Sequence, residues 1–155
     1  MVKTIQDEIR QTKPFARRSD EALVSILRTA TVLEHAQNEA LKPHGITVTQ
    51  YNVLRMLRGA APAGLCGRDI AERLISKVPD VSRLLDRMEE SGLVSRTRDV
   101  ADRRHVSARI TAKGRRVLSQ ATPGLAALTR ARLERLPPRA LASLVQALAV
   151  VREPI

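Results

Sequence analysis

The sequence has almost no aromatic residues and little that could bind a metal or form a disulfide. Phe15 and Tyr51 are the only aromatic side chains among its 155 residues, and tryptophan is absent. The single cysteine, Cys66, cannot form an internal disulfide, and the three histidines are too scattered for a zinc-finger spacing. We therefore expect no structural metal and no aromatic platform on which single-stranded RNA bases could stack.

Other absences narrow the class of protein. No apolar run approaches the roughly eighteen residues of a membrane-spanning helix, and the first residues lack the apolar core of a signal peptide. We therefore expect a soluble, cytoplasmic protein without a membrane partner. The sequence also contains no glycine-rich phosphate loop, Gly-x-Ser-x-Gly elbow or His-Glu-x-x-His pair. We expect no catalytic residues, no cofactor and no enzymatic activity.

Positive charge is abundant but unevenly distributed. The chain has 27 Lys and Arg against 16 Asp and Glu, a net charge of +11, which favours a polyanionic partner. Residues 68–95 contain five basic and six acidic side chains, whereas residues 96–116 contain eight basic and two acidic ones. The charge excess is therefore concentrated in one short segment, while 43% hydrophobic residues can still support the core of one domain.

The spacing of apolar residues predicts a mainly helical protein with one small β-hairpin. Residues 1–19 are expected to form an N-terminal arm that contains a short helix, either mobile or bound to a partner. From Ser19, a predicted N-cap, apolar residues recur at helical spacing until Pro43. Residues 20–42 should therefore form one long amphipathic helix.

Three further helices are predicted in the middle of the chain. Thr47 and Gln50 fit a capping box that opens the first of them. The next, short helix should begin near Gly67, and the third should carry Pro79 in its first turn and end at Ser91. Two helices joined by a tight turn are the arrangement of a helix-turn-helix.

The third of these helices has two distinct faces. Leu84, Leu85 and Met88 fall on one side at about 100° per residue. Ser82 and Arg83 fall on the opposite side. This helix should therefore pack on the core and present polar groups outward, as a DNA-recognition helix does.

After this helix the apolar period becomes that of strands, and residues 93–110 are predicted to form a hairpin. A hairpin directly after a helix-turn-helix is a wing, so residues 46–111 should bind double-stranded DNA. Thr111 is the predicted cap of another long helix. The apolar stripes of residues 20–42 and 112–152 are more than one protomer could cover, which predicts a helical dimerisation region and a homodimer.

Three segments resemble the MarR (multiple antibiotic resistance regulator) family of bacterial transcription regulators: ITVTQYNVLRMLRGA, DIAERLISKVPDVSRLLDRMEESGLVSR and DVADRRHVSARITAKG. The resemblance covers residues 20–152. Its most specific part is the wing, where Asp102 and Arg104 match an Asp-x-Arg pattern and residues 110–114 match Leu-Thr-x-x-Gly, with isoleucine replacing leucine. The resemblance implies a repressor, with activation as the alternative, that binds a pseudo-palindromic operator. It also implies that Arg104 enters the minor groove and is braced by Asp102.

Nine residues are predicted to contact DNA or to support a contact. Ser82 and Arg83 match the recognition helix of the family, and Arg83 could pair with guanine or with a phosphate. Arg68 and Lys77 lie near helix starts and would reach phosphates. The wing and its strands contribute Arg96, Arg98, Asp102, Arg103 and Arg104.

Plainer interpretations stay open for these residues. Arg83 could instead form an intrahelical ion pair with Asp80, Asp86 or Glu90. Arg87 is nearer the core edge and is expected to form a salt bridge. The basic wing could be no more than a solvated hairpin in an arginine-rich protein. The competing function is a nucleoid-type protein that binds DNA without reading its sequence.

Two further sites are weighed from the sequence. Cys66 falls where the family usually has a capping serine or threonine, so it is expected to cap a helix, with oxidant sensing as the alternative. The resemblance also implies a small-molecule effector between the DNA-binding and dimer helices. Because aromatic walls are scarce, the candidate ligand residues are Arg28, Tyr51, Arg55 and Arg58, each of which could simply be exposed or ion-paired.

Overall fold

The computed structural model describes residues 3–98 and 106–154 and divides the chain into two compact units. The first unit, residues 1–37, contains α1 (Ile5–Glu8) and most of α2 (Arg18–Leu41). The carbonyl of Arg17 accepts the first backbone hydrogen bonds of α2, so the helix begins earlier than predicted. Ser19 therefore lies inside the first turn and is not the N-cap.

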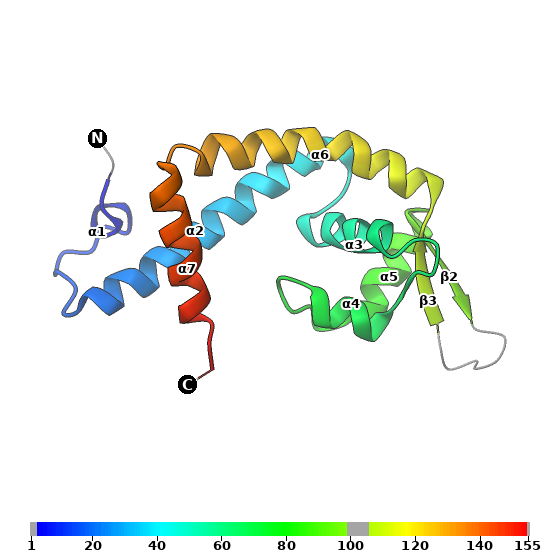
Figure 1. Ribbon diagram of the computed structural model, residues 1–155, viewed down its shortest axis with the longest axis horizontal. Coiled ribbons are helices and arrows are strands. Elements are labelled where there is room, and N and C mark those ends of the chain that lie inside the picture. Colours follow the sequence, from blue (N-terminus) through cyan, green and yellow to red (C-terminus); the bar gives the residue numbers. More distant parts are fainter. Residues whose placement is uncertain (1–2, 99–105, 155) are drawn as a thin grey trace. The chain divides into compact units, whose positions relative to one another are not determined.

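The second unit, residues 38–155, contains all the remaining elements. Helices dominate it, which confirms a mainly helical protein with a small sheet (Figure 1). Within the residues described, no helix is both long and apolar enough to cross a membrane. In chain order the elements are η1 (Lys42–His44), α3 (Val48–Gly59), β1 (Leu65–Cys66), α4 (Gly67–Arg73), α5 (Val81–Glu90), β2 (Val94–Arg98), β3 (Val106–Ile110), α6 (Ala112–Leu133) and α7 (Pro138–Val151).

Side-chain caps set where the helices of the second unit begin. Thr47 and Gln50 form both hydrogen bonds of the predicted capping box at the start of α3. The prediction that Pro79 lies in the first turn of α5 is wrong. The carboxylate of Asp80 accepts the N–H of Arg83 at 3.0 Å, which makes Asp80 the N-cap and leaves Pro79 outside the helix.

The sheet has three antiparallel strands in the order β1-β3-β2. Pairing of Val94 with Ile110 and of Arg98 with Val106 confirms the predicted hairpin, whose tip, residues 99–105, lies outside the described part. Strand β1 was not predicted, although Leu65 pairs with Ala108. A strand of two residues is too short to show any alternation of apolar and polar side chains.

The core of the second unit lies between α3, α4, α5, α6 and the sheet. Val53, Leu57, Ile70 and Leu118 are fully buried there. Leu84, Leu85 and Met88 of α5 join them, as their helical spacing predicted. Helix α7 contributes no buried residue.

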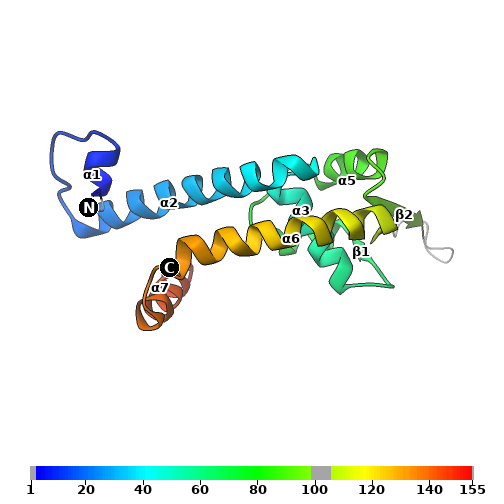
Figure 2. The same cartoon turned by 90° about the horizontal axis from the view of Figure 1, so that it is seen from above.

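The start of α6 is fixed to the base of the hairpin. Figures 1 and 2 both show the sheet at the end of α6 where the helix begins. Thr111 Oγ1 donates to the carbonyl oxygen of Gly92 at 2.7 Å and accepts the N–H of Gly114. A β-carbon on Gly114 would collide with the carbonyl oxygen of Leu93, so this position requires glycine. The Thr-x-x-Gly pattern therefore has a structural role here.

Candidate nucleic-acid interface

Helices α4 and α5 are the two helices of a helix-turn-helix, and β2 and β3 form the wing that follows them. Burial of Leu84, Leu85 and Met88 turns the opposite face of α5 outward, and Ser82 and Arg83 are exposed on that face. The structure therefore presents these two side chains as the sequence predicted.

Arg83 keeps its guanidinium free of ion pairs within the described residues. Its backbone N–H bonds the carboxylate of Asp80, which acts as the helix cap. Asp86, a second candidate partner, pairs with Arg96 instead. The intrahelical ion pair proposed as the alternative role of Arg83 is thus not formed in this part of the chain, and the side chain is accessible to a partner.

Arg87 does not form the salt bridge predicted for it in the part of the chain that the structure describes. Its Nε donates to the carbonyl oxygen of Arg83, one turn earlier, at 3.3 Å. Arg83, Asp86 and Arg87 line one open groove of about 550 Å³ along α5. The groove is therefore bordered by charges of both signs.

Arg96 of β2 lies against the carboxylates of α5. Its Nε donates to Glu89 Oε2 at 2.8 Å, and its backbone N–H donates to Glu89 Oε1, also at 2.8 Å. Its Nη2 pairs with Asp86 Oδ1. The hydrogen bond from Arg96 lowers the pKa of Glu89, and the bond to Glu89 raises the pKa of Arg96. Both shifts favour the charged forms of Glu89 and Arg96.

The structure gives less information about the other predicted DNA contacts. Arg68 forms an exposed ion pair with Glu72, one turn later on α4, at 3.1 Å. Lys77 is exposed in the connection between α4 and α5, and Arg98 ends β2. Three residues of the predicted site lie outside the described part of the chain: Asp102, Arg103 and Arg104.

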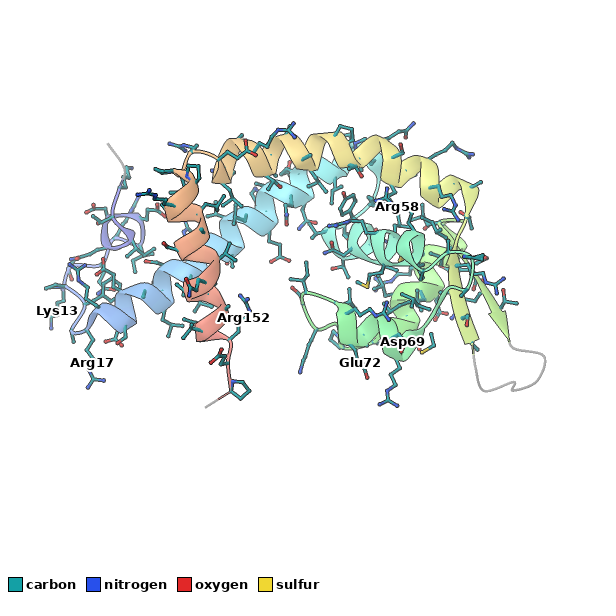
Figure 3. The ribbon with its side chains drawn as sticks, viewed as in Figure 1. Lys13, Arg17, Arg58, Asp69, Glu72 and Arg152 are labelled. Carbon is teal, nitrogen blue, oxygen red and sulfur yellow. The ribbon has the colours of Figure 1, made fainter. Side chains whose placement is uncertain are left out.

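Cys66 occupies the N-cap position of α4. The backbone N–H of Asp69 lies 3.5 Å from its sulfur, in the arrangement that a capping serine would adopt. Figure 3 labels Asp69 and Glu72 on this helix. Among the described residues no group of three His, Cys, Asp or Glu side chains could hold a metal ion.

The four candidate effector residues belong to different parts of the described chain. Arg28 belongs to the first unit and pairs with Glu8 at 3.5 Å. Tyr51 is buried, with its hydroxyl 3.2 Å from that of Thr122. The other two, Arg55 and Arg58, line a cavity of about 350 Å³ on α3, whose wall is completed by Arg73 and Ile75, which the sequence did not single out.

Comparison with known proteins agrees with the family resemblance of the sequence. The family model described as the MarR family matches residues 46–106. The chain is 33% identical over 93 residues to the uncharacterised regulator YkoM of Bacillus subtilis, a match that covers 60% of this chain and 58% of YkoM. It is 30% identical over 105 residues to the transcriptional repressor Mb2911 of Mycobacterium bovis, covering 66% of this chain and 74% of the repressor.

Solved structures extend the similarity along the chain. A MarR transcription factor from Planctomyces limnophilus is 30% identical, with 88% of this chain and 99% of that one covered and a TM-score of 0.68. Sco3205, a MarR family regulator from Streptomyces coelicolor solved in complex with DNA, is 27% identical over 91% of both chains, with a TM-score of 0.77. These four relatives are transcriptional regulators by name and not enzymes. The chain belongs to the MarR family of DNA-binding transcriptional regulators.

Proposed function

We propose that this protein is a sequence-specific transcriptional repressor that binds a pseudo-palindromic operator as a homodimer. The observation that carries the proposal is Arg83, exposed on a helix whose other face is packed into the core and free of ion pairs in the described chain. An arginine so placed can form a bidentate contact with guanine in the major groove. A protein with this activity would be located in the bacterial cytoplasm, where it binds DNA.

The wing and the helix starts supply the remaining contacts of this proposal. Arg98, Arg103 and Arg104 would approach the minor groove, whose negative potential attracts arginine, with Asp102 bracing Arg104. Arg68 and Lys77 would hold phosphates and so fix the register of α5 on the duplex. These contacts give affinity, whereas Arg83 gives preference for a sequence.

Exposed apolar side chains support the homodimer. On α7, Val145 is 61% exposed and Val151 is 67% exposed. In the first unit, Leu23 and Leu27 of α2 are also exposed. Large apolar side chains on successive turns of a helix are typical of a surface that a second copy covers. Two copies related by a two-fold axis would place half-sites about one helical turn apart, roughly 10 base pairs.

The test is to select bound fragments from the organism's own genome and to compare their affinity with that of scrambled duplexes at one salt concentration. We expect Arg83→Ala to cost about 1 to 3 kcal/mol on the selected fragment and to relax the preference at one base pair per half-site. Arg87→Ala, the same change one turn later, is the matched control and should preserve the preference. Equal affinity of the native protein for selected and scrambled DNA would instead support a nucleoid-type protein.

A cavity on α3 supports a second, regulatory activity for the same protein. Arg55, Arg58 and Arg73 surround it together with Ile75, a lining suited to an anionic ligand with an apolar part. The wall contains no aromatic side chain, so simple aromatic acids such as salicylate should release DNA only at millimolar concentrations. Calorimetric titration measures this affinity, and a micromolar value with matching loss of DNA binding would contradict the expectation.

A further inference from the structure

Two acidic side chains lie on the helix proposed to read DNA. Asp86 and Glu89 belong to α5, and each contacts the guanidinium of Arg96 on β2. Carboxylates near DNA repel its phosphates, so their presence on this helix requires a compensating arrangement. The neighbouring strand provides one, because Arg96 engages both groups.

The contacts of Arg96 are directional as well as electrostatic. Its Nε and its backbone N–H each bond one oxygen of Glu89 at 2.8 Å, while Nη2 reaches Asp86. The Arg96 side chain is only 29% exposed, whereas that of Arg68, paired on α4, is 86% exposed. Arg96 is thus held in a fixed orientation with its donors facing protein carboxylates.

Removal of Arg96 would free Asp86 for another partner. Asp86 stands three residues after Arg83 on α5, and both line the same groove. Side chains at this spacing on a helix are neighbours and pair readily when their charges are opposite. An unpaired Asp86 would therefore compete with DNA for the guanidinium of Arg83.

We propose that Arg96 supports DNA binding through Asp86 and Glu89, without itself contacting DNA. It joins the wing strand β2 to α5 and keeps the two carboxylates away from Arg83 and from the phosphates. This role replaces the DNA contact predicted for Arg96 from the sequence and makes it a positioning residue. The inference rests on the proposed DNA-binding function.

The test measures Arg96→Ala in two backgrounds, the native chain and the chain that carries Asp86→Asn and Glu89→Gln. Affinity is measured over a range of salt concentrations on a mixed-sequence duplex that is long enough to contact both recognition helices of a dimer. In the native chain we expect Arg96→Ala to weaken binding roughly tenfold, a size usual for coupled neighbours. In the neutralised chain it should change neither the affinity nor the salt slope, because the carboxylates through which it acts are gone.

A direct contact of Arg96 with phosphate gives a different pattern. Its removal would weaken binding equally in both backgrounds and would lower the salt slope by about 0.9 in each. That result would overturn the proposal. Arg98→Ala, two residues along the same strand, is the matched control and should show this background-independent loss.

Two checks keep the comparison interpretable. Circular dichroism must show each variant to be folded at the temperature of the measurement, and Arg96→Gln replaces Arg96→Ala if the alanine variant is not. If the native protein prefers no genomic fragment over scrambled DNA, the proposed repressor function fails. The Arg96 comparison is still decided in that case, because it is made on a mixed-sequence duplex.

Discussion

Helices α5 and α7 both carry apolar stripes, but only one of them buries its stripe. On α5, Leu84, Leu85 and Met88 are buried against the core of the second unit. On α7, a longer and more apolar helix, no residue is buried, and Val145 and Val151 are more than half exposed. Periodicity therefore defines which face of a helix is apolar, whereas burial depends on whether a partner surface exists within the same chain.

The difference separates two kinds of apolar surface. The stripe of α5 contributes to the stability of a single chain, while the exposed part of the α7 stripe can do so only when something covers it. A homodimer would supply that cover, and stability would then depend on protein concentration. Matched substitutions in packed and exposed positions test this distinction directly.

The largest effect is expected for leucine-to-alanine substitutions in the core. Leu118 of α6 is fully buried, and Leu118→Ala should lower the free energy of unfolding by about 2 to 5 kcal/mol at every protein concentration. Leu144 of α7 is 38% exposed, and Leu144→Ala should cost more as the concentration rises through the range of dimer formation. Chemical denaturation at several concentrations measures both. A loss for Leu144→Ala that did not vary with concentration would contradict the dimer.

A smaller effect is expected for two glycines of α6. Gly114→Ala places a methyl group against the carbonyl oxygen of Leu93 and should destabilise the chain by about 1 to 3 kcal/mol. Gly124 has open space where its β-carbon would lie, so Gly124→Ala should stabilise the helix by about 0.5 to 1 kcal/mol. Thermal unfolding of the two variants decides whether the start of α6 belongs to the packed core of the second unit. Equal shifts in Tm would show that it does not.

Sequence reasoning succeeded where a single local signal determines the structure. The capping box of Thr47 and the helical spacing of Leu84 and Met88 depend only on neighbours in the chain, and both predictions are confirmed. Pro79 was misplaced because proline fits either the first turn of a helix or the residues before its cap. The carboxylate of Asp80 decides between these.

Long-range pairing explains most of what the sequence did not reveal. Strand β1 exists because Leu65 meets Ala108 across the sheet, and two residues carry no periodic signal of their own. The partners of Arg96 lie seven and ten residues away on another element. Counting the charges in each segment therefore did not reveal that Arg96 pairs with them. Arg73 likewise joins Arg55 at one cavity only after folding.

The stability that α5 contributes to the second unit should depend on pH, whereas the contribution of α7 should not. The bond from Arg96 lowers the pKa of Glu89, so ionised Glu89 stabilises the fold above the ordinary pKa of a glutamate side chain. This contribution is lost as the pH falls through the lowered pKa in the folded protein. Glu89→Gln should therefore be less stable than the native chain at neutral pH, and the difference should disappear in acid. Denaturation curves across this pH range measure the difference in stability between Glu89→Gln and the native chain, with Leu144→Ala as a control that should not depend on pH. A difference that stayed constant would contradict the pairing.

The smallest effect is expected at Cys66, which caps α4 at the edge of the packed region. Cys66→Ser supplies an oxygen in place of sulfur to the N–H of Asp69 and should preserve full DNA affinity. Gel-shift titrations of both proteins with and without peroxide test the alternative role in sensing. Release of the native protein by peroxide, but not of the variant, would show that Cys66 is an oxidant sensor.

The connection at Thr111 has a consequence for local opening of the fold. The N–H of Thr111 bonds the carbonyl of Leu93, the N–H of Leu93 bonds that of Met88, and the N–H of Gly114 bonds the hydroxyl of Thr111. These three amides belong to the end of α5, the base of the wing and the start of α6, so none can be exposed without disturbing the next. Hydrogen exchange at the three positions should therefore proceed through one cooperative opening, with a single free energy shared by elements that are distant in the sequence.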